Sequence, residues 1–253
     1  MVAPQTTPLF AALSDLGLRR QDNQDSYGYF HGEGATAGKG TLLVVADGMG
    51  GHQGGGVASR MAVDTIIEHY KTASGPSPVE ALREAFARAG QRIYQGAQKQ
   101  PALASMGTTC TALAIVDNHV HLMHVGDTRA YLIRQGQIRR LTSDQTWVQE
   151  MVNQGFLTAR EAQHHPDRNI LMQALGTEST PKSVGSQAPL LVEPADLFVL
   201  CTDGLSGLVE DEEIRDLVLA DSDPQQACAR LVELAKARGG DDNITVLILK
   251  IPA

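Results

Sequence analysis

The chain has 253 residues, 42% of them apolar and 20% charged, a composition typical of a folded protein and too apolar for a disordered one. Lys and Arg total 21 against 29 Asp and Glu, and the resulting net charge of −8 argues against a nucleic-acid partner. No apolar run approaches the ~20 residues of a membrane span, and the N-terminal segment lacks the features of a signal peptide. We therefore expect one cytoplasmic domain over residues 1–253, a monomer with no membrane partner.

The cysteines exclude one class of enzyme. Cys110, Cys201 and Cys228 are odd in number, widely spaced and set among apolar residues, which favours buried reduced thiols over a disulfide framework or a zinc site. None of them lies six residues before an arginine. A phosphatase that uses a cysteine nucleophile needs such an arginine to cradle the phosphate, so this mechanism is excluded.

The first half of the chain predicts a strand followed by two helices. An apolar strand is expected over 41–46. An apolar stripe at helical spacing follows it, formed by Val57, Met61, Ala62, Ile66 and Tyr70. The next helix begins at Ser77, an N-cap with Pro78 in the first turn and Glu80 at the capping-box position. Both helices need a sheet on which to bury their apolar faces.

The second half of the chain predicts mostly strands. Short runs rich in Leu, Val and Ile occupy 109–116, 119–125, 129–134, 196–201 and 243–250. The turn residues "GDTR" separate the runs 119–125 and 129–134, which favours an antiparallel hairpin at that point. A further helix is expected to open at "DPQQ", residues 223–226.

Residues 142–175 differ from their surroundings and predict a small helical insertion. They contain Trp147, a capping box in "TARE" at 158–161 and a His-His-Pro break. We expect this flap to be mobile and to shape the choice of substrate. The order of elements indicates an α/β (α+β) fold in four αββα layers, with two antiparallel sheets packed face to face and helices outside.

Aspartates follow or precede several predicted strands. Asp47 follows one strand and is itself followed by glycine, Asp203 repeats this pattern, Asp242 precedes the last strand, and Asp127 lies in "HVGDTR". An Asp before Gly is often a turn former or a helix N-cap. Several of them at the ends of apolar strands exceed what turns require, and a cluster of anions is stable only when cations neutralise it.

The ligand types indicate which metal is bound. Asp oxygens without paired Cys or His suit Mg²⁺ or Mn²⁺ and disfavour zinc. Two such ions could share Asp47 and hold a water between them, and the carbonyl of Gly48 could reach the second ion. Near the N-terminus, Arg20 follows Arg19 in "LRRQDNQDS" and could bind phosphate with its planar fork, although a single exposed Arg is usually a solvated charge.

A family resemblance adds to these observations. The blocks that carry it span residues 10–250 in this order: "RRQDNQDS", "VVADGMGGH", "MGTTCTAL", "HVGDTRAYL", "LTSDQTWV", "HHPDRNILMQALG", "LCTDGLSGLV" and "GGDDNITVLIL". In them the chain resembles bacterial members of the PPM family, the metal-dependent protein serine/threonine phosphatases of type 2C. The resemblance implies the four-layer fold, two Mg²⁺ or Mn²⁺ ions and a possible third, and phosphorylated proteins as substrates.

The resemblance also implies a role for each matching residue. Asp47 would be the bridging metal ligand, with Gly48 binding through its carbonyl. Asp203 and Asp242 would complete the first ion's ligands, and Asp127 would serve a third, weaker site.

Three further residues have implied roles. Arg20 would bind the substrate phosphate, Asp25 would accept a hydrogen bond from metal-bound water, and Asn243 would orient Asp242. Two positions depart from eukaryotic relatives: Gln24 replaces a metal-binding Glu, and Met49 replaces a His proposed as general acid.

The function expected from this resemblance is hydrolysis of phosphoserine and phosphothreonine by direct attack of a metal-bridging hydroxide, on substrates of serine/threonine kinases. Two alternatives stay open, a catalytically silent phosphoprotein-binding sensor of the same fold and a small-molecule phosphatase. His52 is not included among the catalytic residues, and no nucleotide-binding glycine pattern is present.

Overall fold

The computed structural model describes residues 8–51, 54–74, 77–178, 183–185 and 190–253. Its strands are β1 (Leu9–Asp15), β2 (Asp25–His31), β3 (Thr41–Met49), β4 (Gly107–Thr108), β5 (Cys110–Val116), β6 (His119–Val125), β7 (Arg129–Arg134), β8 (Gln137–Arg140), β9 (Val184–Gly185), β10 (Leu190–Leu191), β11 (Leu197–Cys201) and β12 (Ile244–Lys250). Its helices are η1 (Gly34–Lys39), α1 (Gly54–Thr72), α2 (Pro78–Lys99), η2 (Pro101–Leu103), α3 (Trp147–Asn153), α4 (Ala159–Gln163), α5 (Asp203–Ser206), α6 (Asp211–Ala220) and α7 (Pro224–Ala237).

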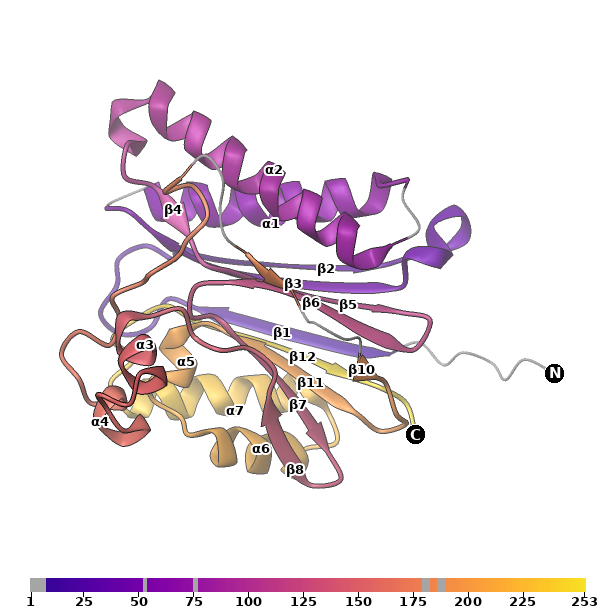
Figure 1. Ribbon diagram of the computed structural model, residues 1–253. Helices are drawn as coiled ribbons and strands as arrows, with labels where there is room; N and C mark the ends of the chain where they lie inside the picture. The colour runs from indigo at the N-terminus through magenta and orange to yellow at the C-terminus, as the bar shows by residue number, and fades with distance from the viewer. Residues whose placement is uncertain (1–7, 52–53, 75–76, 179–182, 186–189) are drawn as a thin grey trace.

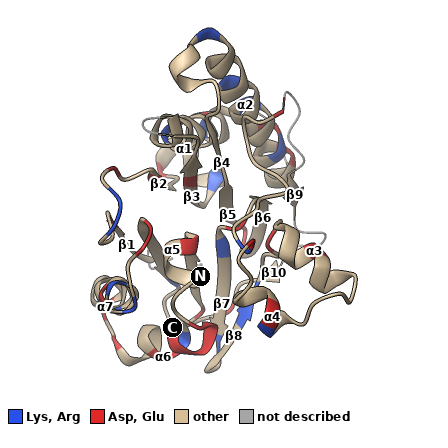
Figure 2. Cartoon of the chain, turned by 90° about the vertical axis from the view of Figure 1, so that its left-hand side faces the viewer, with Lys and Arg blue, Asp and Glu red and all other residues tan. Residues whose placement is uncertain are grey.

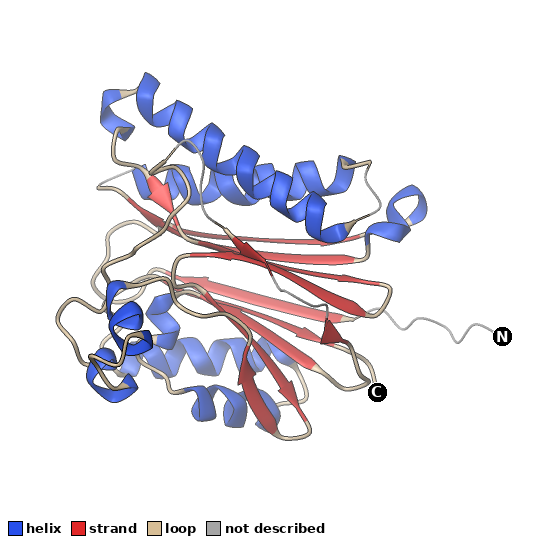
Figure 3. Ribbon diagram, in the orientation of Figure 1, coloured by secondary structure: helices blue, strands red, loops and turns tan. Residues whose placement is uncertain are grey.

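Two antiparallel sheets lie face to face, with helices on their outer faces (Figures 1 and 3). One sheet has the order β1-β12-β11-β7-β8, and the other has the order β10-β6-β5-β3-β2, with β4 paired to β3 and β9 to β6. Helices α1 and α2 cover the second sheet, and α6 and α7 cover the first (Figure 1). The expected four-layer αββα arrangement is confirmed.

Strand β3 shows how the sequence builds these layers. Leu42, Val44 and Ala46 belong to the apolar cluster shared with α1 and α2, whereas Leu43 and Val45 belong to the cluster between the two sheets. This alternation follows from the two-residue period of a strand. All five side chains are fully buried, so a central strand with a continuous apolar sequence still divides its residues between two different interfaces.

The predicted helix starts are confirmed. The Ser77 hydroxyl accepts a hydrogen bond from the Glu80 N–H at 3.3 Å, and Asp223 caps α7. In the flap, Thr158 and Glu161 form the predicted capping box at the start of α4. The cysteines are buried free thiols, as expected.

The expected hairpin between 119–125 and 129–134 is wrong. Strand β6 pairs with β5, β9 and β10 in one sheet, while β7 pairs with β8 and β11 in the other. The segment 126–128 therefore carries the chain from one sheet to the other, a connection that turn residues alone do not distinguish from a hairpin. Asp127 consequently lies where the two sheets meet rather than at an outer turn.

Strand β3 also differs from its expected end. It continues to Met49 because Gly48 pairs with Thr108 and Met49 with Gly107. Asp47 thus lies within the strand rather than after it. His52 falls outside the described residues. No helix in the part of the chain that the structure describes is long and apolar enough to cross a membrane.

Candidate metal centre and phosphate site

The predicted carboxylates gather at one end of the two sheets. Asp25 of β2 and Asp47 of β3 are direct partners in the antiparallel register. Asp203 begins α5 just after β11, and Asp242 precedes β12. Figure 2 views the molecule from the side on which acidic positions of β3 and α5 face the viewer. Residues from remote parts of the sequence therefore meet at one site.

Asp25 is buried and held by hydroxyl groups from the opposite sheet. Its Oδ2 accepts hydrogen bonds from Thr202 at 2.9 Å and from Thr245 at 2.7 Å, whereas its Oδ1 is buried without a partner among the described residues. The pKa of Asp25 is raised to about 7, because burial and, to a smaller extent, the charges of Asp203 and Asp242 outweigh the two threonines, which lower it. This carboxyl group can hold a proton near neutral pH.

Asp47 and Asp203 are close enough to influence each other's ionisation. The pKa of Asp47 is raised well above its usual value, by burial first and then by the charges of Asp25, Asp203, Asp127 and Asp242. Burial and Asp242 raise the pKa of Asp203, while a side-chain hydrogen bond to Asp47 lowers it. The Oδ1 of Asp203 is buried without a partner in the described residues. The charges of Arg20 and Arg129 also lower the pKa of Asp203, so cations near this cluster favour its ionised form.

Asp242 is more exposed and already has partners. Its Oδ2 accepts a hydrogen bond from Arg20 Nη2 at 2.6 Å, and its Oδ1 accepts one from the backbone N–H of Asn243 at 2.8 Å. Arg20 therefore reaches the carboxylate cluster, with its side chain half exposed. By contrast, the Asp241 side chain is 72% exposed and its Oδ1 lies 3.7 Å from Arg19 Nε, so Asp241 faces solvent.

Asn243 contacts both Asp242 and the loop that carries Arg20. Its backbone contacts Asp242, but its side chain accepts a hydrogen bond from the Gln24 N–H at 2.8 Å. The side-chain amide also donates to the carbonyls of Leu16 and Asp22. Asn243 thus fixes the loop that carries Arg20 against the start of β12.

Gly48 allows three backbone segments to meet beside Asp47. A Cβ at this position would lie 2.1 Å from the Gly55 carbonyl oxygen and 2.6 Å from that of Gln24. The Gly48 N–H donates to the Gln24 carbonyl at 3.1 Å. Only glycine fits here, because any side chain would separate β3 from α1 and from the start of β2.

Asp127 faces the same region from the connection between the sheets. It lines a cleft of about 440 Å³ together with Asp203, Asp242 and residues of the flap and the α5–α6 corner. Burial, followed by the charges of Asp203 and Asp144, raises its pKa well above the usual value, and Arg129 lowers it. The cleft therefore connects the carboxylate cluster to the flap.

The donor set fits hard divalent cations. All of its side-chain donors are carboxylate oxygens, one of them, Asp203 Oδ1, is buried without a partner in the described residues, and the cluster repels itself. Within the described residues, no three His, Cys, Asp or Glu side chains are already arranged around one ion position. Asp242 is engaged by Arg20 at 2.6 Å.

Comparison with known proteins identifies the family. The profile described as "Protein phosphatase 2C" matches residues 18–239. This chain belongs to the protein phosphatase 2C family. It is 38% identical to the serine/threonine protein phosphatase PstP of Mycobacterium tuberculosis over 244 residues, which cover 96% of this chain and 45% of that protein. The protein phosphatase PhpP of Streptococcus pneumoniae is 36% identical over 243 residues, which cover 94% of this chain and 96% of that protein.

The chain thus spans less than half the length of PstP but nearly all of PhpP. Among solved structures, that of M. tuberculosis PstP superimposes with a TM-score of 0.85 at 36% identity, covering 97% of this chain and 99% of that one. A structure of the PstP catalytic domain in complex with two manganese ions has a TM-score of 0.82 at 34% identity and covers 97% and 99% of the two chains. The expected family and its fold are confirmed.

Sequence reasoning missed several residues that shape this phosphatase 2C site. Thr202 and Thr245 donate hydrogen bonds to Asp25. In the sequence, the one feature that points to them is that each is a hydroxyl residue at the end of an apolar strand, close to a predicted ligand. Asp144 and Arg129 form an ion pair at the cleft. Both lie inside the quoted motifs, but nothing in the sequence indicates that they face each other.

Proposed function

We propose that the chain hydrolyses phosphoserine and phosphothreonine in proteins at a site that holds two Mg²⁺ or Mn²⁺ ions. The carboxylate cluster carries this proposal, because buried carboxylates that repel each other are suited to hard cations. The manganese pair in the related PstP structure supports the same ion type. Asp47 and the Gly48 carbonyl would bridge and hold the ions, with Asp203 and Asp242 as further ligands and Asp127 at a third, weaker position.

When bound, such an ion pair would offset negative charge and lower the pKa of a bound water, so that hydroxide is available to attack phosphorus. The chain's own groups do the rest. Asp25 can hold a proton at its unpartnered Oδ1, while Thr202 and Thr245 fix its other oxygen. Asp242 is the sole hydrogen-bond partner recorded for the Arg20 side chain among the described residues, so the rest of the guanidinium fork can bind phosphate oxygens.

The experiment is a metal add-back. The purified chain is treated with chelator, and Mn²⁺ is returned in the presence of an aryl phosphate or a phosphothreonine peptide. We expect no turnover without metal, strong loss in Asp203→Asn, and the most severe loss in Asp47→Asn. Activity that persists without divalent metal, or that Asp203→Asn leaves unchanged, contradicts the proposal. Binding of the peptide without phosphate release would instead favour a sensor of the same fold.

Three further expectations complete the proposal. The substrates are phosphoproteins made by serine/threonine kinases, because the cleft is open and bordered by the flap, so that a peptide segment can enter. Residues 1–253 act as a single domain and as a monomer. The cytoplasm is the proposed location, since free buried thiols suit a reducing compartment. Turnover of phosphoproteins should exceed that of small phosphorylated metabolites, and the reverse preference would contradict the assigned substrate class.

A further inference from the structure

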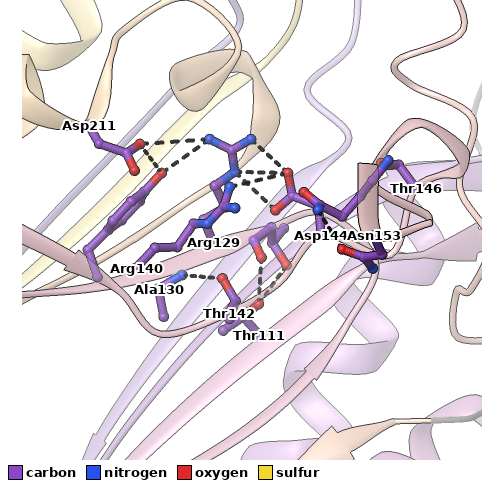
Figure 4. Close-up of polar contacts among 12 residues, drawn as sticks. Thr111, Arg129, Ala130, Arg140, Thr142, Asp144, Thr146, Asn153 and Asp211 are labelled. Atoms are coloured by element: carbon purple, nitrogen blue, oxygen red, sulfur yellow. Dashed lines mark hydrogen bonds and ion pairs between the residues drawn. The ribbon is translucent and has the colours of Figure 1, made fainter. Parts of the chain in front are cut away.

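A partly buried ion pair lies beside the candidate metal ligands. Asp144, at the root of the flap, accepts hydrogen bonds from Arg129 Nε at 3.0 and 3.1 Å and from Arg129 Nη2 at 2.7 Å. The two side chains are 11% and 21% exposed. Figure 4 shows the Arg129 guanidinium between Asp144 and Asp211. Arg140 also approaches the Asp144 carboxylate. This is a forked pair of the strong kind, in a partly buried position at the cleft.

The rest of the guanidinium is also engaged. Arg129 Nη1 donates to the Tyr131 hydroxyl at 3.3 Å and lies 3.8 Å from Asp211, to which Tyr131 donates at 2.9 Å. Arg140 Nη1 lies 3.6 Å from Asp144. The two arginines and two aspartates in this group cancel in charge. In the described residues, none of the recorded hydrogen bonds of Arg129 goes to Asp127 or Asp203.

Those two carboxylates are nevertheless the obvious alternative partners. Arg129 is two residues from Asp127 and lines the same cleft as Asp127 and Asp203. Loss of the forked pair would leave Arg129 with the longer contact of 3.8 Å to Asp211, so the released part of the guanidinium would turn toward Asp127 and Asp203. There it would compete directly with a cation.

The backbone around Asp127 is fixed by the same flap root. The Gln145 N–H donates to the Gly126 carbonyl at 2.7 Å, and the Gly126 N–H donates to Gln145 Oε1 at 2.9 Å. Gln145 therefore fixes the backbone of Gly126, and Asp144 fixes the side chain of Arg129. Asp127 is enclosed between these two attachments.

We propose that Asp144 is a positioning residue that holds the Arg129 guanidinium away from Asp127 and Asp203, so that these carboxylates stay available to divalent cations. This inference rests on the proposed metal site. Neutralising Asp144 should therefore weaken cation binding through Arg129, although Asp144 is not itself among the candidate ligands. Because the effect requires the guanidinium, removing it as well should restore binding.

The test is a double-mutant cycle read out by calorimetric titration of Mn²⁺ into the metal-free protein, so that no turnover is needed. Asp144→Asn should lower the Mn²⁺ affinity by about tenfold or more, since one displaced ionic contact corresponds to a change of that order. Arg129→Gln alone should not lower it. The double variant should return to within about threefold of the wild-type affinity, which would make the two effects strongly non-additive.

A matched control is available elsewhere in the chain. Glu213 forms a comparable forked pair with Arg238, at 2.6 and 2.7 Å, and neither residue lines the cleft. Glu213→Gln should leave Mn²⁺ affinity unchanged. Cooperative thermal unfolding of each variant in chelator shows that it is folded, and Asp144→Glu provides a conservative rescue.

The outcomes separate this inference from the proposed function. Wild-type protein that binds no Mn²⁺ would overturn both. Wild-type protein that binds Mn²⁺, together with Asp144→Asn that binds it equally well, would overturn only the role of Asp144. A double variant that binds no better than Asp144→Asn would overturn it too, because the loss would then not act through Arg129.

Discussion

At the scale of single residues, the candidate site depends on neutral groups that set the charge of Asp25. Thr202 and Thr245 approach this carboxyl group from the opposite sheet, and each donates a hydrogen bond to the same oxygen. A hydroxyl that donates to a carboxylate favours its ionised form. The two threonines therefore oppose the burial that raises the pKa of Asp25 to about 7.

Replacing Thr245 by Val should raise the pKa of Asp25 further. The substitution keeps the shape of the side chain and removes one donor, and a hydrogen bond to a charged group contributes about 1.5–3 kcal/mol. We expect the metal-free variant to bind the Asp25 proton at higher pH than the wild type, as measured by carbon NMR of the aspartate carboxyl groups. Thr245→Ser keeps the hydroxyl and should behave as wild type. Equal titration of the Val and Ser variants would contradict this account.

At the scale of elements, the flap differs from the sheets in how it is held. Its helices α3 and α4 have 7 and 5 residues, and Val148 and Ala162 are the residues that they bury. A hydrogen bond of 2.6 Å from Gln163 to Glu210 ties α4 to the start of α6. Strand β5, in contrast, lies within its sheet between β3 and β6, and nearly all of its residues are buried.

Amides of α3 and α4 should therefore exchange with solvent faster than those of β5. Short helices with little buried apolar surface open locally at a lower free energy than a central strand. Hydrogen exchange followed by mass spectrometry measures both segments in one experiment, with β12 of the other sheet as an internal reference. Protection of the flap equal to that of β5 would show that it is a fixed part of the core and would oppose its predicted mobility.

The sequence predicts elements with continuous apolar runs or strong caps and misses the others. Strands β3, β5, β11 and β12 are buried on both faces, so their sequences are distinctive. Strand β2, "DSYGYFH", is mostly half buried and mixes polar with aromatic residues, and we did not foresee it. The sequence therefore indicates Asp25 as a site residue but does not indicate that it begins a strand paired with Asp47.

Connections are harder to predict than elements. Turn residues such as those of segment 126–128 occur both in hairpins and in connections between two sheets. The pairing of β7 with β11 decides between the two. The same limit applies to the site. Motifs indicate that Asp47, Asp203 and Asp242 belong together, but the contacts of Arg129 with Asp144 depend on side-chain positions that spacing does not encode.

At the scale of the whole molecule, the carboxylate cluster makes the metal-free fold sensitive to pH. The folded-state pKa of Asp25 is raised from 3.8 to about 7, mainly by burial. Between these values the folded chain keeps a proton that the unfolded chain has lost. Stability linked to this group is therefore fully present below the lower value and is lost as pH rises through the window. The raised pKa values of Asp47 and Asp127 act in the same direction.

We expect the melting temperature of chelator-treated protein to fall as pH rises from 4.5 to about 7. Mn²⁺ should remove much of this fall, because a bound cation stabilises the ionised carboxylates and the folded state with them. Differential scanning calorimetry across this range, with and without Mn²⁺, measures the effect. A control series with Asp25→Asn should show a weaker dependence on pH. A rise in stability with pH in the metal-free protein would oppose this assignment of charge.

The central claim is that carboxylates from separate strands jointly hold a pair of hard cations. The most direct measurement is anomalous diffraction from crystals soaked in Mn²⁺. We predict two strong peaks beside Asp47, about 3.5–4 Å apart, as in sites that share a bridging ligand, with Asp203 and Asp242 in contact with one of them. Crystals with full access to Mn²⁺ that show no peak beside Asp47, or peaks only at surface carboxylates such as Asp241, would contradict the claim.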